Sequence, residues 1–190
     1  MPTTPSTLRL GAALTALEYG GVIACPTEAV WGLSCDPDNP SAVRRLLALK
    51  RRPVHKGLIL VAANESQLGF LLTDLSQGQR QTLSDSWPGP STWLIPHQGR
   101  VQPWIHGGHE TVAVRVTAHP TMRALCEGFG GPLVSTSANP SGSQPPRERF
   151  QLIRYFGDEL DAVLSGAVGD SRRLSLLRDL VRGKTILSGT

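Results

Sequence analysis

The feature that most constrains the fold is a regular alternation of short apolar segments with amphipathic ones along the chain. Apolar residues within 10–17 follow the i, i+3, i+4, i+7 spacing of a helix, and Gly20-Gly21 ends it. Val22–Cys25 then predicts a short buried strand. The same reading predicts further helices at 39–50, 64–72, 76–86, 120–129 and 147–156. It predicts further strands at 30–33, 58–62, 92–95, 112–116, 133–136, 162–164 and 184–187.

This alternation is typical of an α/β fold in which helices cover a twisted sheet. Several connections between strands are too short for a crossover helix, so the sheet is expected to be mixed rather than all parallel. The 190 residues show no shift in composition that would mark a boundary. We therefore expect residues 1–190 to form a single domain.

Several classes of protein are excluded. The longest apolar run, Leu58–Ala63, is far shorter than the ~18 residues of a membrane span. The first residues lack the basic and apolar regions of a signal peptide. The three cysteines, Cys25, Cys35 and Cys126, form no C-x-x-C pair and predict neither a disulfide framework nor a zinc knuckle. The simplest location is the reducing cytoplasm.

The positive charge of the chain is concentrated in one segment. The formal net charge is +4, yet no carboxylate occurs between Asp38 and Glu65. The cations of this basic segment are Arg44, Arg45, Lys50, Arg51, Arg52 and Lys56. Without them the chain would be slightly acidic. Solvated helix faces usually mix charges of both signs, so the missing carboxylates indicate an anionic ligand near this segment.

Four loops at predicted strand ends carry polar residues, where ligands of α/β proteins tend to bind. They are residues 26–32, the end of the basic segment, residues 111–115 and residues 135–142. In the third loop, Thr111 and Arg115 share one face of a predicted strand. An arginine between valines needs a partner, which is a carboxylate either of the protein or of a ligand.

Common nucleotide-binding and hydrolase motifs are absent. The chain has no G-x-x-x-x-G-K-[ST], no G-x-G-x-x-G and no G-x-S-x-G. His106-Gly-Gly-His109 places two histidines three residues apart, but two intervening glycines predict a flexible loop rather than a rigid metal site. No metal ligand is therefore predicted among the side chains.

The polar loops together resemble the YrdC-like threonylcarbamoyl-adenylate synthase family, in its short single-domain form. The matching segments occur in the family's order, and they are 26–33, 50–53 with 56–58, 87–92, 111–116 and 132–142. The resemblance implies a three-layer α/β domain with a twisted mixed sheet of about seven strands and a concave basic cavity. It also implies synthesis of threonylcarbamoyl-AMP and pyrophosphate from L-threonine, bicarbonate and ATP.

The resemblance further implies the context of the reaction and the roles of single residues. A downstream complex would use the product for threonylcarbamoyladenosine modification of tRNA, and Mg²⁺ would be bound mainly through the ATP phosphates. Catalytic roles fall on Lys50 and Arg52. Substrate-binding roles fall on Thr27, Arg115, Ser137 and Ser175. ATP-binding roles fall on Arg52, Lys56, Thr111, Asn139 and Arg147. Leu187 stands where the family often has an ATP-contacting arginine.

Two other functions stay open from the sequence. The basic segment could make the chain an RNA-binding module for tRNA or double-stranded RNA, although no aromatic residue lies between its cations to stack on bases. Weak RNA binding is also compatible with the enzyme. A relative with the same pocket could instead transfer a carbamoyl group to another acceptor.

Overall fold

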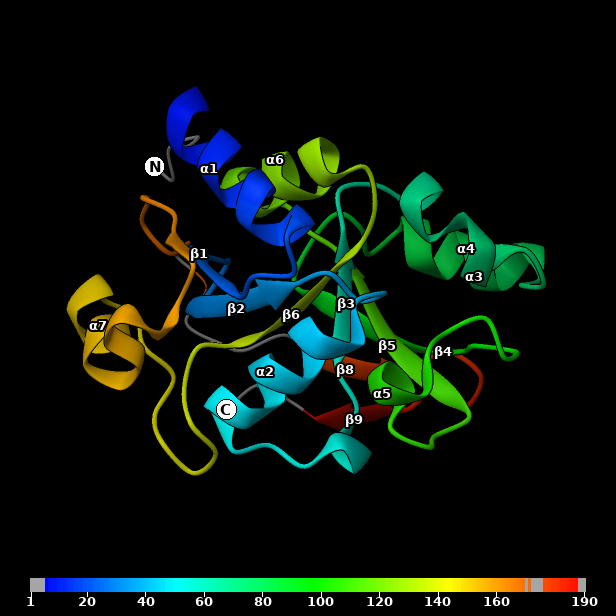
Figure 1. Cartoon of the computed structure of the whole chain (residues 1–190). Helices are drawn as coiled ribbons and strands as arrows, with labels where there is room; N and C mark the ends of the chain where they lie inside the picture. The colour runs from blue at the N-terminus through cyan, green and yellow to red at the C-terminus, as the bar shows by residue number, and fades with distance from the viewer. Residues whose placement is uncertain (1–5, 170, 172–175, 188–190) are drawn as a thin grey trace.

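Residues 6–169, 171 and 176–187 are described by a computed structural model, in which nine strands form one mixed sheet (Figure 1). The strand order is β7-β1-β2-β6-β3-β5-β4-β8-β9. The strands are β1 (Ile23–Pro26), β2 (Trp31–Cys35), β3 (Ile59–Ala62), β4 (Ser91–Pro96), β5 (Thr111–Val116), β6 (Leu133–Ser137), β7 (Ala162–Val163), β8 (Leu176–Asp179) and β9 (Thr185–Leu187).

The prediction of a mixed sheet is confirmed, whereas the predicted number of strands is wrong. Three neighbouring pairs are parallel, β1 with β7, β3 with β5 and β4 with β8, and the other pairs are antiparallel. The family resemblance implied about seven strands, whereas the sequence pattern predicted eight strand segments. Strand β8 was missed because its sequence, two leucines followed by Arg178 and Asp179, has no alternating pattern.

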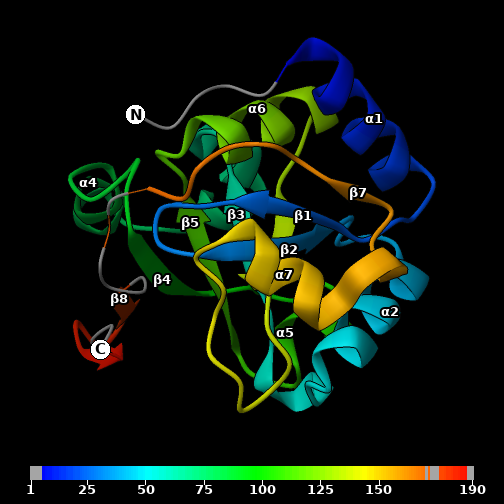
Figure 2. The ribbon, with the colours of Figure 1, turned by 90° about the vertical axis from the view of Figure 1, so that its left-hand side faces the viewer.

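Two helices cover one face of the sheet (Figures 1 and 2). Helices α1 (Thr7–Glu18) and α6 (Pro120–Phe129) pack together over β1, β3 and β6. Leu17 and Leu125 are fully buried there against Val61 and Leu133. The opposite face carries a second and larger apolar core, so the domain has the expected three layers.

Helix α2 (Pro40–Lys50) shows why the second layer forms where the sequence predicts it. The Asn39 side chain accepts hydrogen bonds from the backbone N–H groups of Ser41 and Ala42, and Pro40 occupies the first turn. The helix ends at Arg51, whose φ of 49° is left-handed. The remaining elements are η1 (Val54–Lys56), η2 (Glu65–Leu68), α3 (Gly69–Leu72), α4 (Gln77–Ser84), α5 (Pro103–His106), α7 (Arg149–Phe156) and η3 (Gly157–Glu159).

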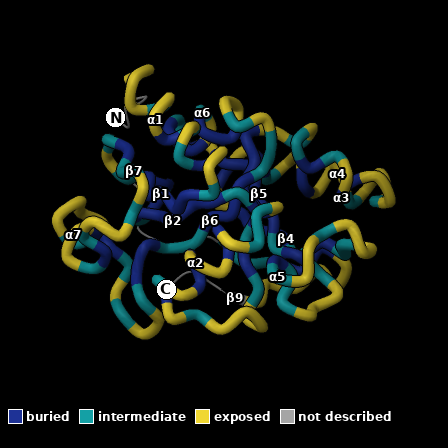
Figure 3. Tube along the Cα trace, in the orientation of Figure 1, coloured by how far each residue is buried: buried dark blue, intermediate teal, exposed yellow. Residues whose placement is uncertain are grey.

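The burial of α7 differs from the prediction. The helical spacing of Phe150, Ile153 and Phe156 predicts that they form its apolar face, but Phe150 and Ile153 are exposed. Leu152 and Phe156 are the residues buried against the larger core. Figure 3 shows the buried central strands beside the exposed outer turns of the helices. The buried face of the helix is therefore formed by Leu152 and Phe156, and Leu152 takes the place predicted for Ile153.

Neither a membrane span nor a disulfide is found in the described part of the chain. None of its helices combines the length and the hydrophobicity needed to cross a bilayer. Cys25, Cys35 and Cys126 are buried free thiols.

Candidate active site

The site lies on the sheet face that α1 and α6 cover only in part. The strand register places Ser135 beside Ile59, and Ile59 beside Ala113, so these side chains share one face. Strand residues lining a pocket of about 640 Å³ here are mostly small or hydroxyl-bearing. They are Gly32, Ile59, Thr92, Leu94, Thr111, Val112, Ala113, Arg115, Ser135, Thr136, Ser137 and Leu177. Because most of them are smaller than leucine, the sheet itself forms a concave floor.

One end of the pocket is formed by the turn between β1 and β2. The Thr27 hydroxyl donates a hydrogen bond of 2.7 Å to the Val30 carbonyl, which fixes its side chain at the pocket wall. Gly32 lies beside it, and a Cβ atom there would come within 3.1 Å of Thr27 Cγ2. A larger residue at Gly32 would therefore displace Thr27.

A nearly buried ion pair lies next to this turn. Arg115 Nη2 is 3.4 Å from Glu28 Oε2, and the two side chains are 9% and 14% exposed. Glu28 Oε1 also accepts hydrogen bonds from the Thr117 hydroxyl (2.6 Å) and the Ala118 N–H (3.2 Å). Burial would raise the pKa of Glu28, but Arg115 and these donors outweigh it and lower the pKa below 4.5. Arg115 thus has a protein carboxylate as partner and also lines the pocket.

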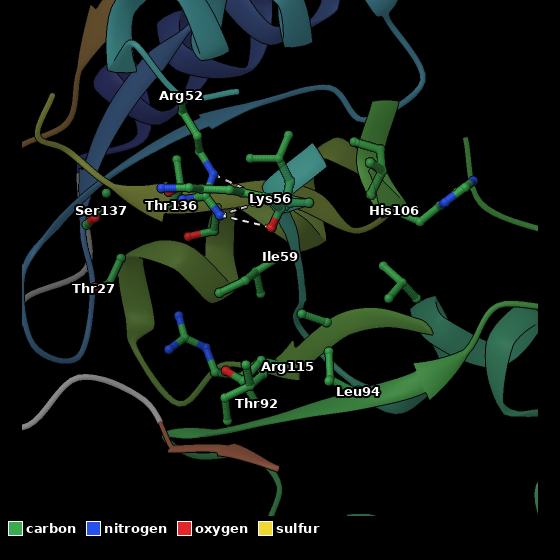
Figure 4. A pocket seen from close by; sticks show the side chains of 18 of the residues that line it. Thr27, Arg52, Lys56, Ile59, Thr92, Leu94, His106, Arg115, Thr136 and Ser137 are labelled. Carbon is green, nitrogen blue, oxygen red and sulfur yellow. Dashed lines mark hydrogen bonds between the residues drawn. The ribbon is translucent and has the colours of Figure 1, made fainter. Parts of the chain in front are cut away.

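The basic segment supplies the opposite wall through the loop after α2. The Arg52 guanidinium donates from Nε (3.3 Å) and Nη2 (2.9 Å) to the Gly57 carbonyl, and from Nη2 to the Lys56 carbonyl (3.2 Å) (Figure 4). These bonds wrap the loop around the guanidinium, and partial burial lowers the pKa of Arg52. Lys56 is exposed and lines the pocket. The loop therefore presents two cations to any ligand bound there.

The remaining cations of the basic segment do not line the pocket. Arg45 Nη1 forms an ion pair of 2.5 Å with Asp161, which is 116 residues away in the sequence. Arg44 donates to the Ser41 hydroxyl on the exposed side of α2, and Arg51 is exposed. The missing carboxylates in the basic segment therefore did not mean that Arg45 lacks a protein partner, because its partner comes from another part of the chain.

Lys50 lies behind the pocket wall rather than in it. Its residue is 4% exposed, and its ammonium donates to the carbonyls of Ser137 and Asn139, the latter at 2.8 Å. Burial, with a smaller contribution from Arg52, lowers the pKa of Lys50 to about 8. The Asn139 amide donates to the carbonyls of Pro140 and Ser143. Both residues therefore shape the turn that follows Ser137, which itself lines the pocket.

The structure thus brings together six of the predicted site residues around one pocket: Thr27, Arg52, Lys56, Thr111, Arg115 and Ser137. Arg147 is exposed, outside the pocket lining, and donates to the Ser171 carbonyl at 3.2 Å. Ser175 lies outside the described residues. Leu187 is the last residue of β9.

Several lining residues were not predicted. Glu28 stood within a polar loop of interest but received no role. Thr92 and Thr136 also line the pocket, and Thr92 joins it only because β4 pairs with β5. His106 and His109 were considered only as metal ligands, and both line the pocket.

No group of three or more histidine, cysteine, aspartate or glutamate side chains is placed to hold a metal ion within the described ranges. Glu28, the carboxylate in the pocket lining, is engaged by Arg115, Thr117 and Ala118. The described side chains therefore offer no ready-made cage for a cation.

Comparisons with known proteins agree with the fold. A family model for the Sua5/YciO/YrdC group, described as "Telomere recombination", matches residues 15–187. The threonylcarbamoyl-AMP synthase of Pseudomonas aeruginosa (strain UCBPP-PA14) is 57% identical over 181 residues, which cover 95% of this chain and 97% of that protein.

Two solved structures are also similar. P. abyssi Sua5 in complex with L-threonine aligns with a TM-score of 0.82 and 30% identity, over 90% of this chain and 51% of that longer chain. The chain therefore spans about half of that protein. E. coli YciO aligns with a TM-score of 0.88 over 100% of this chain and 93% of that one. Its identity of 21% supports the shared fold alone.

Proposed function

The chain belongs to the Sua5/YciO/YrdC family, and on that premise we infer that it is a threonylcarbamoyl-AMP synthase. It condenses L-threonine, bicarbonate and ATP to threonylcarbamoyl-AMP, with release of pyrophosphate, and so serves threonylcarbamoyladenosine modification of tRNA. The observation that carries this inference is a single pocket lined both by the nearly buried Arg115 and by the cations Arg52 and Lys56. Such a pocket suits one small carboxylate and one polyphosphate.

We assign threonine to the end formed by Thr27, Arg115 and Ser137. The planar guanidinium of Arg115 matches a carboxylate, and Glu28 holds it in place. The hydroxyl groups of Thr27 and Ser137 would bind the polar atoms of the same small substrate. Because Arg115 is already desolvated in the free protein, little further desolvation of the protein is needed when the carboxylate binds.

We assign the triphosphate of ATP to Arg52 and Lys56, with Thr111 on the adjoining strand. Arg52 is held by the carbonyls of its own loop, so its position is set before the ligand arrives. Mg²⁺ would enter as part of the substrate, bound to phosphate oxygens and water, since the carboxylate of Glu28 is already engaged. Its chemistry would be to offset negative charge on the phosphates.

The reaction proposed for this pocket needs positioning more than a covalent nucleophile. The threonine amine and bicarbonate form a carbamate with loss of water, and a carbamate oxygen attacks the α-phosphorus of ATP. The bond to the β-phosphate oxygen breaks and pyrophosphate leaves. Arg52 and Lys56 stabilise the negative charge that develops on the leaving group. The pocket holds the two anionic substrates side by side against their repulsion.

Lys50 and Asn139 support this site from behind in our proposal. The Lys50 ammonium holds the carbonyls of residues 137 and 139, and thereby places the side chain of Ser137. A direct catalytic role of Lys50 would require the ammonium to leave these carbonyls. The roles given to Ser175 and Arg147 stay predictions.

The wider context is proposed on the same grounds. We propose that residues 1–190 act as one domain in the cytoplasm and pass the product to a downstream tRNA-modification complex. A function as an RNA-binding module has less support, since Lys50 is buried, Arg45 is paired and Arg52 bonds its own loop. Weak contact with RNA would fall to the exposed Arg44 and Arg51.

A pyrophosphate-release assay tests the proposed function. Release of pyrophosphate from ATP should require both L-threonine and bicarbonate, and mass spectrometry should find threonylcarbamoyl-AMP. Pyrophosphate release without threonine, or a carbamoyl group found on another acceptor, would reject the assignment. RNA binding that is steeply salt-dependent and is lost in Arg44→Ala/Arg51→Ala, with no pyrophosphate release, would favour the RNA-binding module.

A further inference from the structure

Three histidines, one at the end of α5 and two on the loops beside it, form a cluster that the proposed reaction does not use. The rings of His97 and His106 are stacked, with centroids 4.2 Å apart and planes 18° from parallel. His97 Nε2 bonds the His109 carbonyl at 2.9 Å, and His109 Nε2 bonds the His55 carbonyl at 2.8 Å. The cluster therefore ties the β4–α5 and α5–β5 loops to the loop of Arg52 and Lys56.

The segment that carries these rings is closely packed against its neighbour, contrary to the flexible loop predicted from its two glycines. A Cβ atom on Gly107 would come within 2.5 Å of the Val54 carbonyl oxygen and 2.8 Å of the Gly57 nitrogen. The Leu58 N–H also donates to the Ile105 carbonyl at 2.8 Å. Gly107 thus allows the backbones to meet, and His106 sits on a fixed support.

The His106 ring is held as a neutral imidazole. The backbone N–H of Gly99 donates to His97 Nδ1, and that of Gly108 donates to His106 Nδ1, each at 3.1 Å. A ring nitrogen that accepts from an N–H carries no proton itself. Burial, then the neighbouring His97 and His109, lower the pKa of His106.

His106 faces the end of the pocket away from the threonine subsite. In Figure 4, Thr27 and Ser137 lie at one end of the pocket, His106 and Leu94 lie at the other, and Arg52 and Lys56 lie between them. Leu94 and Ile105 add apolar surface near His106. His97 does not line the pocket, so it supports the His106 ring from behind.

We propose that the His106 ring, supported by His97, is the surface on which the adenine base of ATP stacks. A neutral aromatic ring beside apolar side chains suits a flat, uncharged base, just as the cations suit the phosphates. His106 thereby sets where the nucleoside end of ATP lies, and His97 is a positioning residue that acts through it. The inference rests on the proposed use of ATP.

The test compares a ligand that has a base with one that lacks it. Isothermal titration calorimetry measures binding of ATP and of inorganic tripolyphosphate to the full chain without threonine. His106→Ala should weaken ATP binding about 5- to 100-fold, as loss of one base–aromatic contact does. Tripolyphosphate binding should stay within about twofold, because the cations are unchanged. His106→Phe should retain most of the ATP affinity.

Two further variants sharpen the result. His97→Ala should weaken ATP binding less than His106→Ala, again without affecting tripolyphosphate, which a general loss of folding would not produce. His55→Ala is the matched control, because only the backbone carbonyl of His55 takes part in the cluster and its side chain is not in the pocket lining. It should bind both ligands as the unmodified protein does.

Three outcomes would overturn the proposal. Equal loss of ATP and tripolyphosphate in His106→Ala would make His106 a phosphate contact. Unchanged ATP binding would place the base elsewhere, and so would failure of the unmodified protein to bind ATP more tightly than tripolyphosphate. Failure of the proposed function would give a different result. The unmodified chain would then bind ATP through His106 but release no pyrophosphate in the presence of threonine and bicarbonate.

Discussion

One face of the sheet is divided into two halves that share strands but differ in their side chains. In the covered half, Val61 and Leu133 are fully buried beneath α1 and α6. In the open half, Ser135 and Ser137 follow Leu133 on the same strand and the same face, and they line the pocket. A step of two residues along β6 therefore passes from the protein core to the binding site.

The difference shows how little the backbone has to change to make a site. The strand pairing of β6 with β3 runs through Leu133, Val134 and Ser135 without a break. What changes is the volume and polarity of the side chains and the extent of the helices above them. Bulk in the covered half stabilises the fold, and missing bulk in the open half leaves space for substrates.

The covered half should respond to lost volume through stability. Leu133→Ala removes a fully buried side chain and should lower the free energy of unfolding by about 2–5 kcal/mol. Pyrophosphate release per folded molecule should be unchanged. Urea unfolding measures the first quantity and an assay corrected for folded fraction measures the second. A larger loss of activity than of folded protein would mean that the two halves are coupled.

Arg115 tests the boundary between the halves, because it pairs with Val61 across the strands and also lines the pocket. Arg115→Ala should weaken threonine binding by roughly 1.5–3 kcal/mol through loss of a charge-assisted hydrogen bond. ATP binding should change little. Calorimetry with each substrate distinguishes the two effects.

The matched control for this variant is Arg100→Ala. Arg100 also pairs with a carboxylate, Asp74, but that pair is exposed. Its removal should leave both affinities unchanged and cost at most about 1 kcal/mol of stability. If Arg115→Ala weakened ATP and threonine binding equally, the separate threonine subsite would be wrong.

The open half should respond to small changes through activity. Ser135→Ala removes one hydroxyl from the pocket lining and should change the free energy of unfolding by less than about 1 kcal/mol. The value of kcat/KM should fall by about 2- to 10-fold, as the loss of one ordinary hydrogen bond allows. A stability loss as large as that of Leu133→Ala would erase the distinction drawn between the halves.

The smallest expected effect is a pH dependence of stability from Glu28. Its pKa is lower in the folded protein than its ordinary value of 4.5. The stabilisation is therefore complete above that value and is lost as pH falls through the lowered pKa. Glu28→Gln should flatten this acid dependence in thermal unfolding, whereas Glu127→Gln, which removes an exposed pair with Arg123, should not. Identical acid profiles would contradict the role of Glu28.

The sequence was informative where chemistry and spacing coincide within one segment. Thr27, Arg52 and Arg115 were predicted from loops at strand ends and from the family resemblance, and the fold brings these strand ends together. Helix α6 was predicted at its observed bounds because the stretch from Pro120 to Phe129 has a clear helical spacing.

The sequence was uninformative where a partner comes from far along the chain. Nothing near Lys50 indicates that its ammonium is buried under the carbonyls of residues 137 and 139. The pairing of Arg45 with Asp161 and the stacking of His97 on His106 likewise depend on tertiary structure. Local spacing predicts which residues share an element, but it does not predict which elements meet.

The strand order also has a consequence for the order of folding. Strand β6 lies between β2 and β3, although about 70 residues of chain follow β3 before β6 begins. As the polypeptide is synthesised, the edges of β2 and β3 have no partner until residue 137 has emerged, and such edges invite association with other chains. Contacts this distant in sequence also slow folding. The floor of the pocket includes β6, so the ability to bind substrates would be among the last properties that the growing chain acquires.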